Sequence, residues 1–249
     1  MLKVVIAAAG KGTRMQELTK DKAKTLLEVA KRPFLAYLLD NLILAGYNDF
    51  VLVVGFRPEL MQIFVEKYLE EKKDENLKIK LINQFEKLGP KEKIYGTACP
   101  VMCVKDVVGQ NNFLYINGDN FYSVRDLKSI DTENNQNYVL GAESDRPQDF
   151  GVLKVDGDNL QEIIEKPKEF VGSLVNASLY KFTPEIFEKV SQIKKSLRGE
   201  YEITDAVNLL AREEKVKAKK LQDQNCWIDF GRPDDIERFE KIINENNSK

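Results

Sequence analysis

A short stretch near the start of the chain combines small residues with cations that suit a phosphate. Residues 6–24 read IAAAGKGTRMQELTKDKAK and include the end of an apolar run. Backbone N–H groups in a loop of small residues can point together at one anion. Arg14 offers a planar fork to phosphate oxygens, and Lys24 offers a compact positive charge. The stretch therefore predicts a site that holds a polyphosphate at the end of a sheet.

The glycines of this stretch match neither of two well-known phosphate-binding motifs. Gly10 and Gly12 do not fit GxxxxGK[ST], and Met15 stands where GxGxxG needs its third glycine. An ordinary turn from strand to loop, with its charges in solvent, is the alternative interpretation. The pattern by itself leaves both open.

Two aspartates far apart in the chain are candidates for a shared divalent cation. Asp119 follows the apolar run FLYI within Gly-Asp-Asn, and Asp229 lies inside the apolar stretch WIDFG. Mg²⁺ prefers carboxylate oxygens, and a charge among apolar residues needs a partner or a metal. The alternatives are an Asx turn at Asp119 and, for Asp229, a pairing with arginine or a helix cap. Taken together, the two residues favour one metal site.

Further positions could face a ligand, and each has a plainer interpretation. Glu165 and Lys166 precede a proline, which biases Lys166 toward an extended backbone. The alternative for this pair is a surface turn. Asn176 is a lone amide in an apolar stretch, placed there for a ligand or for a hydrogen bond in the core. Gln84 and the helix start at Thr97 are candidates for base recognition, although Gln84 equally fits a solvent-facing strand end.

The chain contains no histidine among its 249 residues. This absence excludes Ser–His and Cys–His nucleophilic catalysis and removes the commonest general base. Three cysteines, Cys99, Cys103 and Cys226, without a CxxC spacing, predict free and inert thiols instead of a zinc site. An enzyme of this composition has to work with carboxylates, lysines, arginines and a hard metal ion.

The elements that must position these residues follow an α/β rhythm in the first half of the chain. Apolar runs at 3–8, 50–54, 77–82 and 113–116 predict buried strands, and helical spacing predicts helices that begin at Pro33 and Pro58. The second half is richer in strands, with candidates at 138–142, 151–155, 160–165 and 174–182 and helices at 184–190, 204–213 and 233–243. We expect a three-layer α/β fold with a mostly parallel twisted sheet, helices on both faces and a smaller β-rich lobe.

Length and charge narrow the class of protein. The formal net charge of -2 offers no basic footprint for nucleic acid. No apolar run reaches the roughly 20 residues that span a bilayer, and the N-terminal stretch does not read as a signal peptide. We expect a cytoplasmic protein with one domain over residues 1–249 and no nucleic-acid or membrane partner. A homo-oligomer stays open.

Eight short motifs, in order along the chain, resemble those of the sugar-phosphate nucleotidylyltransferases, such as glucose-1-phosphate thymidylyltransferase and UTP–glucose-1-phosphate uridylyltransferase. They are AAAGKGTRM with Lys24, YGTA, GDN, DFGV, EKP, VNAS, GEYEITD and WIDFG. The resemblance implies a Rossmann-like nucleotidyltransferase fold whose β-rich lobe binds the sugar. It also implies Mg²⁺ as cofactor and a reaction between a nucleoside triphosphate (UTP or dTTP favoured) and a hexose 1-phosphate (glucose 1-phosphate favoured). No hexapeptide repeat is present, so we expect no C-terminal β-helix acetyltransferase domain.

The resemblance further implies a role for each residue that matches a motif. Residues around the nucleotide would be Ala8, Gly10, Gly12, Thr13, Arg14, Gln84, Gly89, Thr97, Ala98 and Asp119. Residues around the sugar phosphate would be Gly151, Glu165, Lys166 and Asn176. The catalytic residues would be Arg14, Lys24, Asp119 and Lys166, and the metal ligands would be Asp119 and Asp229.

Two positions depart from the family pattern. Ala23 stands before Lys24, where the family usually has proline, and Arg232 follows Gly231, where the family often has threonine. The first change predicts a less preorganised Lys24. The second predicts an altered pyrophosphate or sugar side. Neither change removes a charged catalytic group.

The implied chemistry agrees with the absence of histidine. A sugar 1-phosphate has its second pKa near 6, so it is mostly a dianion at neutral pH and attacks without a general base. The obstacle is repulsion, since two unit charges about 4 Å apart cost roughly 4 kcal/mol at intermediate screening. Mg²⁺, Arg14, Lys24 and Lys166 would offset it. Two other hypotheses remain: an idle subunit that binds sugar nucleotides or serves assembly, and a cytidylyltransferase that acts on a non-sugar phosphate.

Overall fold

The computed structural model describes residues 2–10, 12, 15, 18–19, 22–131 and 134–247. Within these residues, one sheet has nine strands. Their order across the sheet is β5 (Lys78–Asn83), β4 (Asp49–Val54), β1 (Lys3–Ala8), β6 (Phe113–Asn117), β11 (Leu174–Phe182), β8 (Asn137–Glu143), β12 (Val216–Lys220), β10 (Asn159–Glu165) and β9 (Gly151–Asp156). Every predicted strand is confirmed. Strand β12 was not predicted, because its lysines hide a short alternation of buried Val216 and Ala218.

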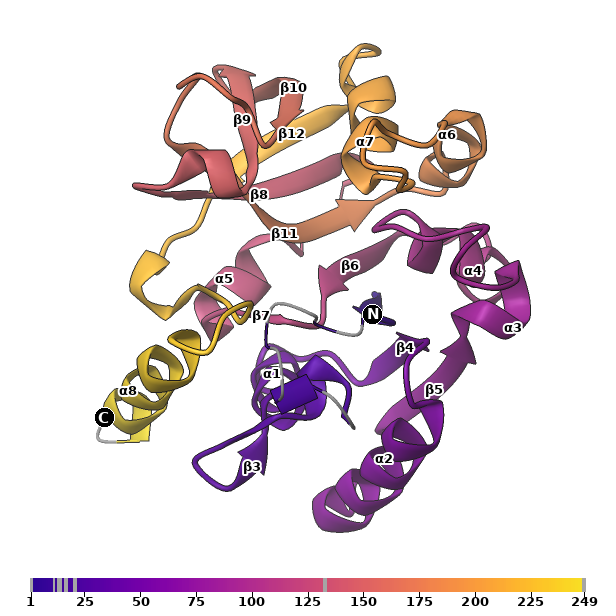
Figure 1. Ribbon diagram of the computed structural model, residues 1–249, viewed down its shortest axis with the longest axis vertical. Helices are drawn as coiled ribbons and strands as arrows, with labels where there is room; N and C mark the ends of the chain where they lie inside the picture. Colours follow the sequence, from indigo (N-terminus) through magenta and orange to yellow (C-terminus); the bar gives the residue numbers. More distant parts are fainter. Residues whose placement is uncertain are drawn as a thin grey trace.

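The sheet changes character between β6 and β11. On one side, β1 pairs in parallel with both β4 and β6, and β4 pairs in parallel with β5. On the other side, β11 runs antiparallel to β6 and β8, and β10 runs antiparallel to β9 and β12. Figure 1 shows the parallel half below and the mainly antiparallel half above. The predicted α/β architecture with a β-rich lobe is confirmed. The sheet as a whole is mixed instead of mostly parallel, because the strands of the β-rich lobe join the same sheet and pair mainly antiparallel.

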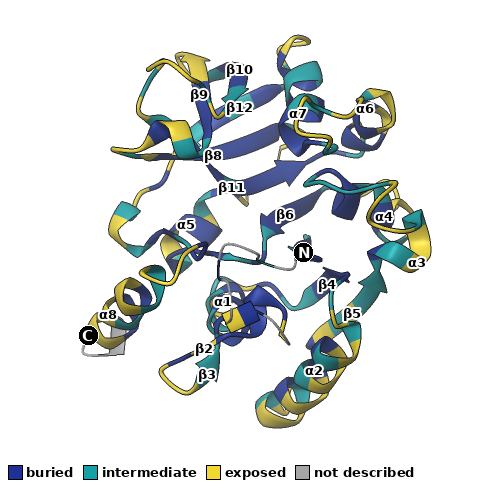
Figure 2. Cartoon of the chain, viewed as in Figure 1, coloured by how far each residue is buried: buried dark blue, intermediate teal, exposed yellow. Residues whose placement is uncertain are grey.

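Helices cover both faces of the sheet because neighbouring side chains of a buried strand point in opposite directions. Val4 of β1 belongs to one apolar cluster with residues of α1 (Phe34–Leu44) and α2 (Pro58–Lys72). Val5 belongs to another cluster with residues of α4 (Cys99–Val108), α6 (Ile186–Gln192) and α7 (Ile203–Ala211). Figure 2 shows buried strands between helices with exposed outer sides. The predicted helices are confirmed, and the short α3 (Gln84–Leu88) and α5 (Val124–Ser129) are additional.

A third apolar cluster joins the end of the chain to the parallel half. Here Phe34 stacks on Phe230 with ring centroids 4.5 Å apart, and Phe239 of α8 (Asp235–Asn247) lies 4.7 Å from Phe34. The same cluster contains Phe121 of the two-residue strand β7 (Asn120–Phe121), which pairs with β13 (Ile228–Asp229). A second small ladder joins β2 (Glu28–Val29) to β3 (Arg32–Pro33). The aromatic cluster around Phe34 and the β13–β7 ladder hold the WIDFG segment beside the GDN segment.

Two smaller expectations can also be compared with the structure. Cys99 and Cys103 are free and buried on α4, and burial raises the thiol pKa of Cys103 to about 11, as expected for inert thiols. Among the residues described, no helix is long and apolar enough to cross a membrane.

Candidate functional site

One cavity of about 430 Å³ brings together most of the residues that the sequence singled out. Its walls come from the carboxyl ends of β1 and β6 and from β9, β10 and β11, so it joins the two halves of the sheet. The expected residues that line it are Gly10, Gly12, Lys24, Gln84, Thr97, Asp119, Gly151, Glu165, Lys166, Asn176 and Asp229.

A few expected residues do not line this cavity. Ala8 is buried in the core, while its neighbours Ala7 and Ala9 line the wall, because side chains alternate along β1. Gly89 follows α3 as its cap, with φ +95°, and Ala98 is fully buried at the start of α4. Thr13 and Arg14, both expected at the nucleotide, lie outside the described residues.

Lys24 and Asp119 form the central charged contact of the cavity. Lys24 begins a 3₁₀ turn (Lys24–Leu26), and Asp119 is the second residue after the end of β6. The ammonium group of Lys24 is ion-paired with the carboxylate of Asp119. Asn120 donates to the other carboxylate oxygen over 3.1 Å. Burial by itself raises the pKa of Asp119, but the charge and hydrogen bond of Lys24 overcome this effect and lower it below its usual value. Asp119 is therefore ionised throughout the neutral range.

The backbone around Lys24 explains two features of the motif. Gly12 has φ +71°, and a Cβ there would lie 2.6 Å from Cβ of Lys24, so the close approach requires glycine. Ala23 replaces the proline that the family usually has, yet its φ of -64° and ψ of 141° are values that proline adopts. The alanine therefore preserves the backbone course that leads into Lys24.

Asp119 and Asp229 come together through backbone pairing. Asp229 pairs with Asn120 across the β13–β7 ladder, and the N–H of Phe230 donates to the carbonyl oxygen of Asp119 over 2.8 Å. Both aspartates line the same cavity. In the part of the chain that the structure describes, no cluster of three or more Asp, Glu, Cys or His side chains forms a ready metal site. Two carboxylates suit Mg²⁺, which keeps several waters and takes further ligands from substrate phosphates.

Gln84 is buried, with 1% of its surface exposed, and it begins α3. The alternative that it ends a strand in solvent is therefore wrong, because the side chain of Asn83 caps α3 and turns the chain inward. Neither the nitrogen nor the oxygen of the Gln84 amide has a hydrogen-bond partner among the described residues. A buried amide without partners is costly. Because Gln84 also lines the cavity, this amide offers a donor and an acceptor to a ligand.

Arg198 contacts three carboxylates that line the cavity, and the sequence reasoning missed it. Its guanidinium lies 3.0 Å from Glu165, 3.4 Å from Glu200 and 3.6 Å from Glu202. Burial and the negative charge of Glu202 raise the pKa of Glu165, although Arg198 opposes the shift. Arg198 immediately precedes the GEYEITD motif, which was the available signal.

Lys166 does not have the extended backbone that its following proline predicts. Its φ is +45°, and its N–H donates to the carbonyl oxygen of Phe150 over 2.9 Å. This hydrogen bond and the pairing of Glu165 with Gly151 hold the turn against the local preference. Strain of this kind is concentrated at functional sites. The strained backbone at Lys166 therefore supports a functional role for the turn that places Glu165 and Lys166 in the cavity wall.

Asn176 makes hydrogen bonds in the core, which is one of its two expected roles, and it also lines the cavity. Its amide nitrogen donates to the hydroxyl of Tyr180, and its oxygen accepts the N–H of Ser178 over 3.0 Å. The pairing of β11 with β8 shifts register here, and Ser178 has φ +58°. The amide therefore stabilises a bulge in the strand.

Thr97 links the YGTA motif to the GEYEITD motif. Its hydroxyl accepts the N–H of Ile203 over 2.9 Å, and its carbonyl oxygen accepts the hydroxyl of Tyr115 over 2.7 Å. A Cβ on Gly96, which has φ +137°, would lie 2.3 Å from the carbonyl oxygen of Tyr201. Two segments distant in sequence thus share one wall, and only glycine permits the approach.

Comparisons with known proteins match the chain to the nucleotidyl transferase family over residues 3–246. A UTP–glucose-1-phosphate uridylyltransferase, AglF of Haloferax volcanii, is 30% identical over 254 residues, covering 100% of this chain and 99% of that protein. A bifunctional sugar-1-phosphate nucleotidylyltransferase/acetyltransferase of Sulfurisphaera tokodaii is 32% identical over 234 residues. That match covers 93% of this chain but 53% of the relative, so the chain spans about half the length of this bifunctional protein.

Solved structures share the fold over almost the whole chain. A UDP-glucose pyrophosphorylase crystallised with UDP-glucose superposes with a TM-score of 0.80 at 21% identity, covering 100% of this chain and 99% of the other. A UDP-glucose pyrophosphorylase of Acinetobacter baumannii superposes with a TM-score of 0.77 at 21% identity, covering 98% and 92%. At this identity the likeness establishes the fold alone.

Proposed function

The chain belongs to the nucleotidyl transferase family, and from that premise we propose that it joins a nucleoside triphosphate to a hexose 1-phosphate and releases pyrophosphate. UTP or dTTP and glucose 1-phosphate are the favoured substrates, and the full-length similarity to AglF supports UTP with glucose 1-phosphate. The observation that carries the proposal is one cavity with distinct ends. The buried, unpartnered Gln84 follows β5 at one edge of the sheet, Glu165 ends β10 near the other edge, and Asp119, paired with Lys24, follows β6 between them.

The reaction we propose is an in-line displacement at the α-phosphorus. An oxygen of the sugar phosphate forms a bond to this phosphorus, and the bond to the oxygen that bridges the α- and β-phosphates breaks, so that pyrophosphate leaves. The nucleophile is already a dianion at neutral pH, and no proton has to be removed. Lys24 and Lys166 reduce the repulsion between the anions, and the walls hold the reactants in line.

Asp119 and Asp229 are the residues that would hold a divalent cation, for which we propose Mg²⁺. When bound, such an ion neutralises charge on the phosphates and helps to orient them. The donor set fits, because two carboxylates, one in β13 and one directly before β7, leave room for waters and phosphate oxygens. The lowered pKa of Asp119 keeps its carboxylate ionised and able to bind a cation.

The two ends of the cavity divide the recognition of the substrates. The Gln84 amide can pair with a base edge that carries a donor beside an acceptor, as the edges of uracil and thymine do. Glu165 can accept hydrogen bonds from sugar hydroxyls. Lys166, whose N–H donates to the carbonyl oxygen of Phe150, can meet the sugar phosphate. A hydrophobic pocket separates uracil from thymine weakly, since one methyl group is worth about 1–3 kcal/mol.

The test is pyrophosphate release from a panel of four nucleoside triphosphates and the 1-phosphates of glucose, mannose, galactose and N-acetylglucosamine, with Mg²⁺. We expect turnover with UTP or dTTP and glucose 1-phosphate, and its loss on chelation with EDTA. Silence across the panel, with binding of UDP-glucose intact, would instead indicate an idle binding or assembly subunit. Turnover with CTP and a non-sugar phosphate alone would indicate a cytidylyltransferase. Either result overturns the proposal.

A further inference from the structure

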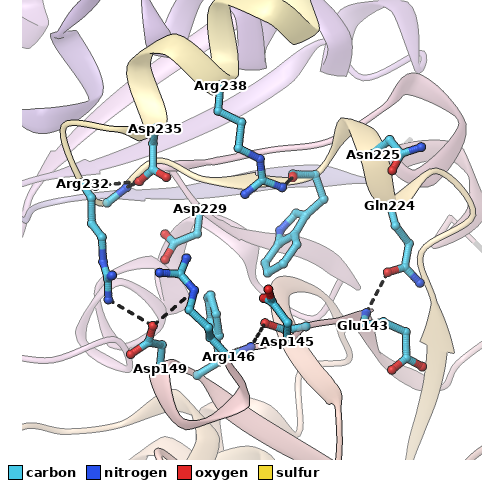
Figure 3. A pocket seen from close by; sticks show the side chains of 14 residues that line it. Glu143, Asp145, Arg146, Asp149, Gln224, Asn225, Asp229, Arg232, Asp235 and Arg238 are labelled. Atoms are coloured by element: carbon cyan, nitrogen blue, oxygen red, sulfur yellow. Dashed lines mark hydrogen bonds and ion pairs between the residues drawn. The ribbon is translucent and has the colours of Figure 1, made fainter.

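A second cavity, of about 310 Å³, lies beside the first and shares part of its wall. Asp149, Phe150, Asp229 and Gly231 line both. The second cavity separates the loop between β8 and β9 from the segment that follows β13. Figure 3 shows that charged side chains from both segments extend into it, and none of the reactants proposed above requires them there.

Arg232, one of the two departures from the family pattern, crosses this second cavity. Its Nη2 donates to Oδ2 of Asp149 over 3.0 Å, and Nε of Arg146 lies 3.9 Å from the same oxygen. Figure 3 shows the side chains of Arg232 and Arg146 directed at Asp149 from different parts of the chain. A threonine at position 232, which the family often has, is too short to make this contact.

The backbone at Arg232 is held by hydrogen bonds to Asp235. The N–H groups of Gly231 and Arg232 donate to Oδ2 of Asp235 over 2.8 and 2.7 Å. Just before them, the ring of Phe230 is fully buried in the aromatic cluster, and its N–H binds the carbonyl oxygen of Asp119. Arg232 therefore extends from a rigid anchor three residues after Asp229.

The acceptor end of the contact leads directly to the sugar side. Asp149 precedes Phe150, whose carbonyl oxygen accepts the N–H of Lys166 over 2.9 Å. The next residue, Gly151, pairs with Glu165 across the β9–β10 ladder. A displacement of Asp149 would therefore move the backbone that positions Glu165 and Lys166.

We propose that Arg232 is a positioning residue. Its ion pair with Asp149 holds the loop 145–150 against the segment 229–235, and so keeps Glu165 and Lys166 aligned with Asp229. This inference rests on the proposed function and deepens it, because it concerns how tightly the sugar phosphate is held. Both side chains are partly exposed, and pairs of this kind add little to global stability. Substitutions there should therefore leave the fold intact.

A double-mutant cycle with R232T, D149N and the double variant tests the inference. We expect each single change to raise the KM for the sugar 1-phosphate about three- to tenfold, and the double variant to be no worse than either. The KM for the triphosphate should change less than about twofold, and Arg232→Lys should recover part of the loss. Salt should weaken sugar-phosphate binding more in the unmodified protein than in R232T.

Arg238→Thr is the matched control. Arg238 lines the same cavity, but its guanidinium donates a 3.3 Å hydrogen bond to the carbonyl oxygen of Trp227 instead of pairing with Asp149. We expect its KM for the sugar 1-phosphate to stay within about twofold. Additive effects of R232T and D149N, or an equal effect of R238T, would overturn the inference. Equal losses for both substrates would do the same.

Calorimetric binding of UDP-glucose separates the inference from the proposed function. If the protein binds UDP-glucose but has no turnover, the proposed function fails, and the same cycle carried out on Kd decides the role of Arg232. Non-additive losses in Kd would support the positioning role, and additive losses would refute it. If the protein does not bind UDP-glucose, the inference fails together with the proposed function.

Discussion

The two ends of the cavity differ in what their polar groups do before any ligand is bound. At the end that we propose for the nucleotide, Gln84 is buried and its amide makes no hydrogen bond within the described structure. At the end that we propose for the sugar, Glu165 is ion-paired with Arg198, and the amide of Asn176 makes its hydrogen bonds within its own strand. One end has an unused donor and acceptor, and the other has groups that already have partners.

This difference has consequences for binding. A ligand that satisfies Gln84 removes the cost of a buried amide, so its hydrogen bonds are a net gain. A ligand that needs Glu165 has to compete with Arg198 and compensate for the contact that it weakens. We therefore expect nucleotide recognition to depend strongly on one side chain, while sugar recognition depends on alignment of a turn. The contact of Arg232 with Asp149 contributes to sugar recognition, because it helps to align this turn.

The largest expected effect lies between the two ends. Lys24→Ala or Asp119→Asn should lower kcat about 100-fold or more, because each removes a charge from the reacting centre. Steady-state pyrophosphate release measures this. Lys22→Ala is the control, since Lys22 is about half exposed, lies 3.7 Å from Glu28, and should leave kcat unchanged. Near-normal rates in Lys24→Ala, with metal dependence retained, would contradict the proposed reaction.

An intermediate effect should distinguish the nucleotide end. Gln84→Met should raise the KM for the triphosphate about tenfold through loss of the base contacts, and leave the KM for the sugar 1-phosphate unchanged. The same change should increase the free energy of unfolding by about 1 kcal/mol without ligand, because it removes a buried amide that has no partner. Urea denaturation and initial-rate kinetics measure the two effects.

Gln62→Met is the matched control for this experiment. Gln62 lies on the exposed side of α2, where its amide donates to Glu66. It should change neither quantity appreciably. A destabilised Gln84→Met protein would show that the amide has hydrogen-bond partners in the ligand-free protein, and the contrast between the two ends would then disappear.

The smallest effect on KM is expected at the proposed sugar end, where the free energy of unfolding should also depend on pH. Glu165→Gln should raise the KM for the sugar 1-phosphate about fivefold, since an amide accepts a hydroxyl less strongly than a carboxylate does. Burial raises the pKa of Glu165 above its ordinary 4.5, and the folded state therefore binds this proton more tightly than the unfolded chain. Its stabilising contribution is complete below the unfolded pKa and is lost as pH rises through the folded pKa.

Denaturation curves across this acidic range measure the difference between the unmodified protein and Glu165→Gln. The unfolding free energy of the unmodified protein should fall relative to that of the variant as pH rises past 4.5. A difference that does not change with pH, or that changes in the opposite direction, would contradict the raised pKa.

Much of the candidate site could be predicted from the sequence, because its motifs follow strands that apolar runs predict. Apolar runs such as 3–8 and 113–116 show where parallel strands end, and ligand groups collect at that edge. This reasoning led to Lys24 and Asp119 before any contact was known. It failed at Lys166, where a long-range hydrogen bond from its N–H to Phe150 overrides the preference that a following proline imposes. It also missed Arg198, which joins Glu200 and Glu202 of its own segment to Glu165, a residue that only the fold brings near.

The amino-acid sequence determined the local features of this protein. These are the runs that are buried, the positions of cations that suit a phosphate, and the absence of histidine as a general base. Local propensity and composition suffice for these, because each depends on neighbouring residues. Only the tertiary structure decided that Asp229 lies beside Asp119, that Gln84 is buried without a partner, and that Arg232 reaches Asp149. Those facts depend on strand pairing and packing between distant segments, where the free energy comes from contacts that no local pattern records.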